Sequence, residues 1–308
     1  MNAAADAWKR QRPADGTLSL DHIAHFVPDI ERASQALERL GFTLTPFSLQ
    51  QHRTTPDAPL VPAGSGNRCV MLRQGYLEFL TPTSDTPVSQ RMRAAMARYV
   101  GQHLICFGTS EAARTYRHLT DGRFDPLTPV ALQRQIGTAD GGEATARFTV
   151  LRVPPEAMPE GRVQVVEHHT PELLWQERWL THPNGASALL ASIVCVADPV
   201  EAAGRFARFA HASIRRDGPN ALIESRGGGR ILVIDAKTAQ SSLGAAPPCL
   251  PWIAGVVLRV DDLQATVWHL AGADHAPTRR DGAVIVSGPA ALGGVFVFTA
   301  ADVAELPR

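Results

Sequence analysis

The sequence has no excess of charge of either sign, because 30 lysine and arginine residues balance 30 aspartate and glutamate residues. This balance gives no electrostatic reason to expect a nucleic-acid or anionic-membrane partner. No uninterrupted apolar run reaches the roughly 18 residues of a transmembrane helix, and the N-terminal segment lacks the apolar stretch of a signal peptide. We therefore expect a cytoplasmic protein without nucleic-acid or membrane partners.

Cysteine is also scarce, with four residues spread along the chain and no Cys-x-x-Cys pair. Three of them, Cys69, Cys106 and Cys195, stand inside apolar strand-like runs. This pattern predicts buried free thiols in a reducing compartment. A Gly-x-Ser-x-Gly elbow and a dinucleotide fingerprint are absent as well, so neither of those two sites is expected.

The sequence does contain a strand followed at once by a helix start, and this pattern occurs four times. The helix starts carry Asp29, Ser110, Asp198 and Asp262, residue types that cap helix N-termini. Turn residues and then short strands follow each helix, so the repeating unit is βαβββ. We predict an α+β fold of four tandem βαβββ modules.

The first module, in which "LDHIAHFVPDIERASQALERLGF" leads to "GNRCVMLRQGYLEFLTP", resembles the vicinal-oxygen-chelate superfamily and, within it, the glyoxalase-like domain proteins. The segment "EHHTPELLWQERWLTHPNGA" resembles the same group. The resemblance is good over residues 18–190 and weaker beyond them. It implies modules paired into cupped mixed sheets around a metal. We predict a flexible N-terminal arm (residues 1–17), a glyoxalase-like half with the site (18–185) and a degenerate second half (186–308).

A single carboxylate, Glu78, stands in the middle of the apolar run "YLEFL". Removing an ionised carboxylate from water costs several kcal/mol unless a cation or hydrogen-bond donors meet it. In "LSLDHIAHFV", His22 shares one face of the expected strand with Ala24 and Phe26 and should point inward with them. His22 and Glu78 are therefore candidate metal ligands, and His22 alone is also a candidate internal partner for Glu78.

The second module offers a matching pair. His103 shares a strand face with Ile105 and Phe107, and aligning "YLEFLTP" with "VEHHTP" sets Glu167 opposite Glu78. The resemblance implies a two-His, two-Glu metal site, as in glyoxalase I-type enzymes, made of His22, Glu78, His103 and Glu167. Such nitrogen and oxygen ligands suit Zn, Ni, Fe(II) or Mn. His168 or His169 replaces Glu167 in this set if the strand register shifts by one residue.

Further candidates surround the expected pocket. His52, Asn67 and Arg68 flank a long proline-containing loop, which is either a lid or a solvated excursion. "THPNG" reads first as a turn, and its similarity to the "HPNG" of the family makes His182 and Asn184 candidate substrate-binding residues. In the third and fourth modules the positions that match His22 hold Ala191 and Gly255, so a metal is expected only in the first half.

These residues lead to three hypotheses for a small-molecule partner. The first is a metal-dependent isomerase or lyase acting on a small α-oxygenated carbonyl compound, in which the metal stabilises an enediolate and Glu167 or Glu78 moves a proton. The second is an extradiol-type dioxygenase. The third is a metal-free protein of the bleomycin-resistance type that sequesters a small compound, with Glu78 satisfied by donors such as His22. The chain is expected to be a monomer or a homodimer.

Overall fold

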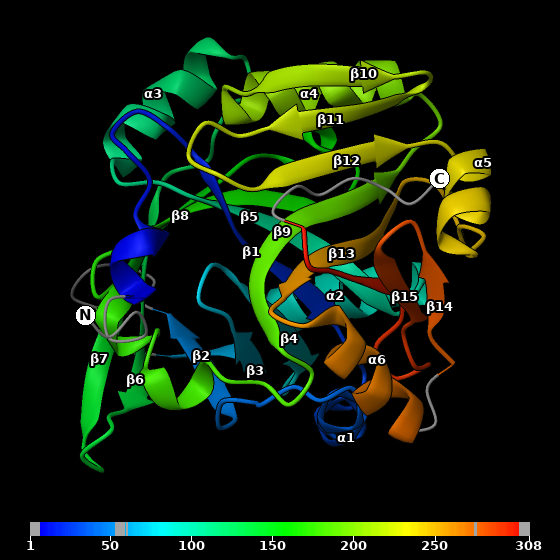
Figure 1. Cartoon of the computed structure of the whole chain (residues 1–308). Coiled ribbons are helices and arrows are strands. Elements are labelled where there is room, and N and C mark those ends of the chain that lie inside the picture. Colours follow the sequence, from blue (N-terminus) through cyan, green and yellow to red (C-terminus); the bar gives the residue numbers. More distant parts are fainter. Residues whose placement is uncertain (1–6, 53–58, 60, 274–275, 302–308) are drawn as a thin grey trace.

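The computed structural model describes residues 7–52, 59, 61–273 and 276–301. Within them the chain forms four successive units, each with a strand, a helix and three more strands (Figure 1). The first two units contain β1 (Ser19–Phe26), α1 (Ile30–Arg39), β2 (Ser48–His52), β3 (Val61–Met71) and β4 (Tyr76–Pro82), then β5 (Gly101–Gly108), α3 (Ala112–Asp121), β6 (Val130–Gly137), β7 (Glu143–Arg152) and β8 (Arg162–His168). Helix α2 (Pro87–Arg98) joins them.

The third and fourth units repeat this order. They contain β9 (Ala186–Cys195), α4 (Pro199–Ala210), β10 (Ser213–Asp217), β11 (Asn220–Glu224) and β12 (Arg230–Ile234), then β13 (Trp252–Val260), α6 (Leu263–Gly272), β14 (Thr278–Arg280), β15 (Ala283–Ser287) and β16 (Val295–Thr299). The short helix α5 (Ala236–Thr238) and a π-helical turn (Ala239–Leu243) lie between them. Each first strand pairs in parallel with the last strand of its own unit. The predicted α+β fold of four βαβββ modules is therefore confirmed.

The first two modules close into a barrel. Their strands follow the order β1-β4-β3-β2-β6-β7-β8-β5, and β5 pairs with β1 to complete the ring. Helix α2 lies across one end, because Met92 packs with the inward-facing residues Phe26, Leu80 and Val150. The barrel therefore encloses a space lined by alternate residues of eight strands.

The last two modules form an open curved sheet that continues from the barrel. β9 and β13 pair in antiparallel fashion, and Ile253 on β13 pairs with Gln102 on β5. Apolar side chains such as Leu190 and Val297 fill the inner face of this sheet. The predicted boundary at residue 185 directly precedes β9, and the division into two domains stays a prediction because the sheet is continuous.

Capping residues set the starts of the module helices. Asp29 accepts hydrogen bonds from two backbone N–H groups in the first turn of α1, and Asp198 and Asp262 do the same for α4 and α6. Helix α3 begins instead after Glu111, whose side chain makes no capping bond. The prediction of Ser110 as its N-cap is therefore wrong.

The described part of the predicted N-terminal arm is packed rather than free. Residues Ala7–Gln11 form a 3₁₀ helix in which Ala7 and Gln11 are buried. The Gln11 amide donates to the carbonyl oxygen of Arg73 and accepts from the N–H of Gly75. These bonds hold residues Ala7–Gln11 against the β3–β4 turn, and the flexibility of the arm stays a prediction. No helix in the described parts of the chain has the length and apolar character needed to cross a bilayer.

A buried histidine at the junction of the two halves, His25, is expected to make the unfolding free energy depend on pH. The His25 ring is fully buried between Phe79 and Phe296, and neither ring nitrogen has a hydrogen-bond partner. Burial, and secondarily the nearby His103, lowers the pKa of His25 to about 3. The unfolded chain therefore binds a proton that the folded chain rejects as pH falls below about 6.5.

We expect this single group to remove about 2 kcal/mol of unfolding free energy between pH 6.5 and pH 5. In the His25→Leu variant, which has a similar side-chain volume, that part of the acid sensitivity should vanish. Urea unfolding at pH 7 and pH 5 measures the difference. An unchanged pH dependence in the variant would show that His25 accepts its proton in the folded state.

Candidate functional site

The barrel of β1–β8 contains a cavity of about 200 Å³. Its polar lining includes His22 on β1, Glu78 on β4 and Gln164 on β8. Its apolar lining includes Leu104 and Phe148. Pockets of this kind, mostly apolar with a few converging polar groups, are typical ligand sites.

A β-bulge in β1 places two charged side chains together. Leu20 pairs with Phe107 and His22 pairs with Cys106, which leaves Asp21 as the extra residue. Asp21 is therefore buried beside His22 instead of pointing to the opposite face. Its carboxylate contacts His22 Nδ1 at 2.6 Å and His168 Nε2 at 3.0 Å. Burial alone would raise the pKa of Asp21, but His168 and His22 outweigh it and hold the pKa well below its usual value.

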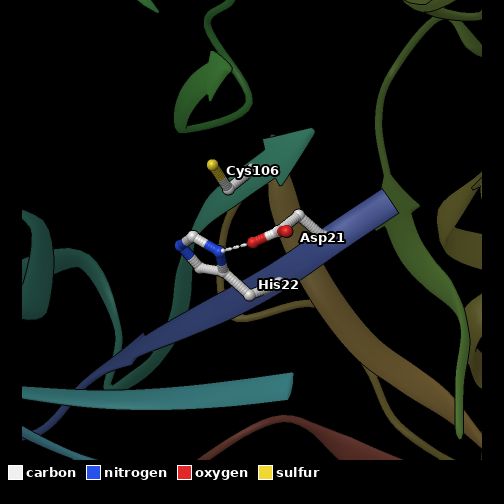
Figure 2. Close-up of side chains that lie close together, drawn as sticks. All are labelled: Asp21, His22 and Cys106. Atoms are coloured by element: carbon white, nitrogen blue, oxygen red, sulfur yellow. Dashed lines mark hydrogen bonds and ion pairs between the residues drawn. The ribbon is translucent and has the colours of Figure 1, made fainter. Parts of the chain in front are cut away.

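The contact with Asp21 fixes the orientation of the His22 ring (Figure 2). Because Nδ1 faces Asp21, Nε2 is left to face Glu78, whose Oε2 lies 3.8 Å away. The ring also stacks on Tyr76 at 4.4 Å between centroids. Burial lowers the pKa of His22, but Cys106 and Asp21 together raise it above its usual value.

The other carboxylate oxygen of Glu78, Oε1, accepts two hydrogen bonds. Asn67 Nδ2 and Gln50 Nε2 donate to Oε1 at 2.5 and 3.2 Å. Gln50 is in turn held by a 2.6 Å hydrogen bond from Ser65, and Arg134 donates to Asn67. Three strands therefore fix the carboxylate so that Oε2 faces His22.

Cys106 provides a third donor at this end of the cavity. Figure 2 shows its thiol on β5 next to Asp21 and His22 on β1, and the three residues offer ligand atoms within 4.8 Å of one another. Burial raises the pKa of the Cys106 thiol although His22 opposes the shift. Gln164 Nε2 lies 3.7 Å from its sulfur.

This donor set fits a divalent metal. Bonds of about 2.0–2.3 Å allow one ion to reach two donor atoms that are 3.8 Å apart. His22 Nε2 and Glu78 Oε2 would be the ligands, and Cys106 Sγ is a further donor that lies beside His22 and Asp21. Nitrogen, oxygen and sulfur donors of this kind suit Zn. Asp21 already contacts two histidines, so its role is to orient His22 as an outer carboxylate.

The two barrel modules are not equivalent at this site. α1 begins at residue 30 and α3 at 112, and β1 begins at 19 and β5 at 101, so one offset of 82 residues relates the modules. The offset matches His22 with Leu104 and Ala24 with Cys106. Glu78 pairs with Ala24, and Gln164 pairs with Cys106. The symmetric positions in the second module therefore hold Leu104 and Gln164 rather than a histidine and a glutamate.

His103, predicted as a ligand, lies outside the cavity. Between Ala24–Leu104 and His25–Gln102 the pairing of β1 and β5 shifts by one residue, which makes His103 a bulge. Its Nε2 donates to the carbonyl oxygen of Tyr99 at 2.8 Å, and burial lowers its pKa to about 4. Its ring stacks on Phe26 and Tyr99, and His103 is not among the described residues that line the cavity.

Glu167 is likewise separated from His22 and Glu78. Its carboxylate accepts a hydrogen bond from the backbone N–H of Ala112, the first residue of α3. Glu167 therefore supplies the cap that Glu111 does not make. Of the alternative ligands, His168 lies at the edge of the site, where it contacts Asp21, whereas His169 contacts Thr149. The sequence analysis did not find the role of His168 beside Asp21.

Of the predicted substrate-binding residues, Asn67 belongs to the site through Glu78. The Arg68 side chain points to Glu31 at the surface. His182 accepts from the N–H of Thr43 and donates to Met71, and Asn184 bonds Leu40 and Ala186. His182 and Asn184 therefore join backbone segments and do not line the cavity. The side chain of His52 and the expected lid, residues 53–58 and 60, lie outside the described residues.

Comparisons with known proteins agree with this architecture. The model of the glyoxalase-like domain family matches residues 20–210. A hypothetical protein from Staphylococcus aureus superposes with a TM-score of 0.62 and 12% identity over 91% of this chain and 98% of its own. A 4-hydroxymandelate synthase mutant from Streptomyces coelicolor superposes with a TM-score of 0.54 and 14% identity, over 96% of this chain and 95% of its own.

A third structure has two parts, and this chain spans about half of it. A xylose isomerase-like TIM barrel/4-hydroxyphenylpyruvate dioxygenase fusion protein superposes with a TM-score of 0.58 and 12% identity, over 95% of this chain and 51% of the fusion. At these identities the likeness shows the fold alone. No curated protein matches the sequence.

Proposed function

The chain belongs to the glyoxalase-like domain family of the vicinal-oxygen-chelate superfamily, and from this premise we propose that its barrel is a metal-dependent active site. The reaction class is isomerisation or elimination on a small α-oxygenated carbonyl compound. His22 and Glu78 would hold the metal, with Cys106 as a further donor beside His22. The metal, when bound, supplies a Lewis acid that polarises oxygen atoms of the substrate.

The observation that carries this proposal is the pairing of His22 Nε2 with Glu78 Oε2 across 3.8 Å. The second polar atom of each side chain is already occupied, Nδ1 by Asp21 and Oε1 by Asn67 and Gln50. Both remaining atoms therefore converge on one point in the cavity. Fixed ligands with outer hydrogen bonds are the arrangement that metal sites use.

The residues of the chain have distinct tasks in this reaction. Asp21 holds His22 in the tautomer that carries its proton on Nδ1, and Asn67 fixes Glu78. Glu78 is the one carboxylate among the described lining residues of the cavity. Its carboxylate would therefore be the base that takes the proton from the carbon next to the carbonyl and returns it, a role that requires Oε2 to be free of the metal. Glu167, which caps α3, is not assigned this step.

Metal-free sequestration of a small compound is the second candidate function. It is favoured by the hydrogen bonds from Asn67 and Gln50 to Glu78 and by the raised pKa of His22, since a protonated His22 would balance the charge of Glu78. An extradiol-type reaction has less support. It requires two histidines, and His22 is the one histidine among the described lining residues.

Exchange of substrate hydrogen with solvent deuterium tests the proposed chemistry. The protein, loaded in turn with Zn, Ni, Fe(II) and Mn, is incubated in deuterium oxide with a panel of α-hydroxy ketones and aldehydes. Proton NMR should reveal loss of the signal from the carbon next to the carbonyl, at a rate that a chelator abolishes. Ligand binding that persists after chelation, without exchange under any metal, would favour sequestration instead.

A further inference from the structure

Three arginines line the cavity, and two of them have no role in the contacts described above. The three are Arg134 on β6, Arg152 on β7 and Arg162 on β8. Arg152 pairs directly with Gln164, and Arg162 lies two residues before Gln164 on the same strand face. Because Gln164 contacts Cys106, which lies beside His22, these two arginines adjoin the His22 end of the cavity.

Arg152 and Arg162 have no carboxylate partner among the described residues. Neither takes part in an ion pair or a side-chain hydrogen bond there, and Arg152 Nε is buried without an acceptor. Arg134 is different, because it bonds Asn67 and stacks on Phe148. The lining therefore has three guanidinium groups for one carboxylate, Glu78.

Such an arrangement is costly for the protein alone. Burial, together with Arg152 and Arg91, lowers the pKa of Arg162 to about 9 although Glu78 opposes the shift. Arg91 on α2 acts on Arg152 in the same direction. Both side chains are half-buried, and a partly desolvated cation without a counter-ion destabilises a fold unless another group compensates it. A ligand with negative charge would supply that compensation.

We propose that Arg152 and Arg162 bind the carboxylate of an organic anion whose reacting carbon lies at His22 and Glu78. Guanidinium groups recognise carboxylates through paired N–H donors in one plane. The body of the ligand is apolar, because Leu80, Leu132, Val150 and Val166 line the rest of the cavity. A cavity of about 200 Å³ restricts that body to a short aliphatic chain or one aromatic ring. The proposal deepens the proposed function, since it names the substrate class of the same site.

Titration calorimetry with matched pairs of probes tests this assignment. The probes are 3-phenylpropanoate with 3-phenylpropanamide, and butanoate with butanamide, added to the protein as purified and after chelation. At least one carboxylate should bind the native protein tenfold or more tightly than its neutral amide. The Arg152→Met/Arg162→Met double variant should bind both members of the pair equally weakly. Arg117→Met, at an exposed position on α3, serves as the control and should keep the native preference.

Thermal unfolding checks separately that the Arg152→Met/Arg162→Met double variant is folded. Removal of two uncompensated cations should leave the midpoint of thermal unfolding unchanged or higher, so lost binding is not caused by unfolding. Equal binding of acid and amide by the native protein, or no binding of either carboxylate, would overturn the proposal. So would an unchanged preference in the double variant. Because the preference for a carboxylate is also measured after chelation, its loss is distinguishable from a failure of the metal site.

Discussion

Glu78→Gln is expected to lower metal affinity by roughly 100-fold or more, while the fold stays intact. Glutamine keeps the shape of the side chain and an oxygen that accepts from Asn67 and Gln50. Its NH₂ group replaces Oε2, the atom 3.8 Å from His22 Nε2, and an amide nitrogen does not bind a metal. Proton exchange on the carbonyl substrate should disappear with it, because the same carboxylate carries the proton.

The matched control for this substitution is Glu167→Gln. Its carboxylate caps α3 through Ala112, and the glutamine oxygen can still accept that bond, so the variant should keep its metal and lose at most about 1 kcal/mol of helix-cap stability. Metal per chain, measured after equilibrium dialysis against a weak chelator, separates the two variants. Loss of metal from both variants would restore the symmetrical assignment drawn from the sequence, and retention of metal in Glu78→Gln would contradict the site.

Asp21→Asn is expected to cost both stability and metal affinity. The carboxylate accepts from His22 and His168 at once, whereas an asparagine has one oxygen and presents an N–H donor to the other ring. Breaking a buried charged network of this kind costs about 3–5 kcal/mol. Loss of the group that orients a metal-binding histidine costs about 10- to 100-fold in affinity.

Urea unfolding in the presence of chelator measures the loss of unfolding free energy. Metal titration of the folded variant measures the loss of metal affinity. Asp29→Asn is the control, because Asn caps a helix about as well as Asp and the position is exposed. A native unfolding free energy and native metal affinity for Asp21→Asn would show that the contacts of Asp21 do not organise the site.

Local sequence patterns predicted much of the fold. The Asp caps at residues 29, 198 and 262 and the strand that follows each helix identified the four modules, and the resemblance to the glyoxalase-like proteins is confirmed. Strand alternation placed His22 inward, and the charge of Glu78 in an apolar run marked the second site residue. These signals need only the neighbours of each residue. Gly255, at the place of His22 in the fourth module, has no room for a side chain, because an added Cβ would lie 2.5 Å from the carbonyl oxygen of Val295.

The missed features depend on pairing between distant strands. One bulge brings Asp21 beside His22 and another moves His103 away, and no local pattern reveals either shift. The Thr-Pro alignment placed Glu167 opposite Glu78, whereas the strand register places Gln164 there. The arginines come from strands of the second module, and a single strand gives no sign that they surround Glu78. Register is set by the closed barrel as a whole.

The most direct test of the metal site is elemental analysis of the protein purified without a His-tag or chelator. A His22→Gln/Glu78→Gln variant is analysed beside it. The account predicts near-stoichiometric Zn, Ni, Fe or Mn in the native protein and its loss in the variant. Absence of metal from the native protein, even after reconstitution with each ion, would contradict the metal site and leave an organic ligand as the occupant of the barrel.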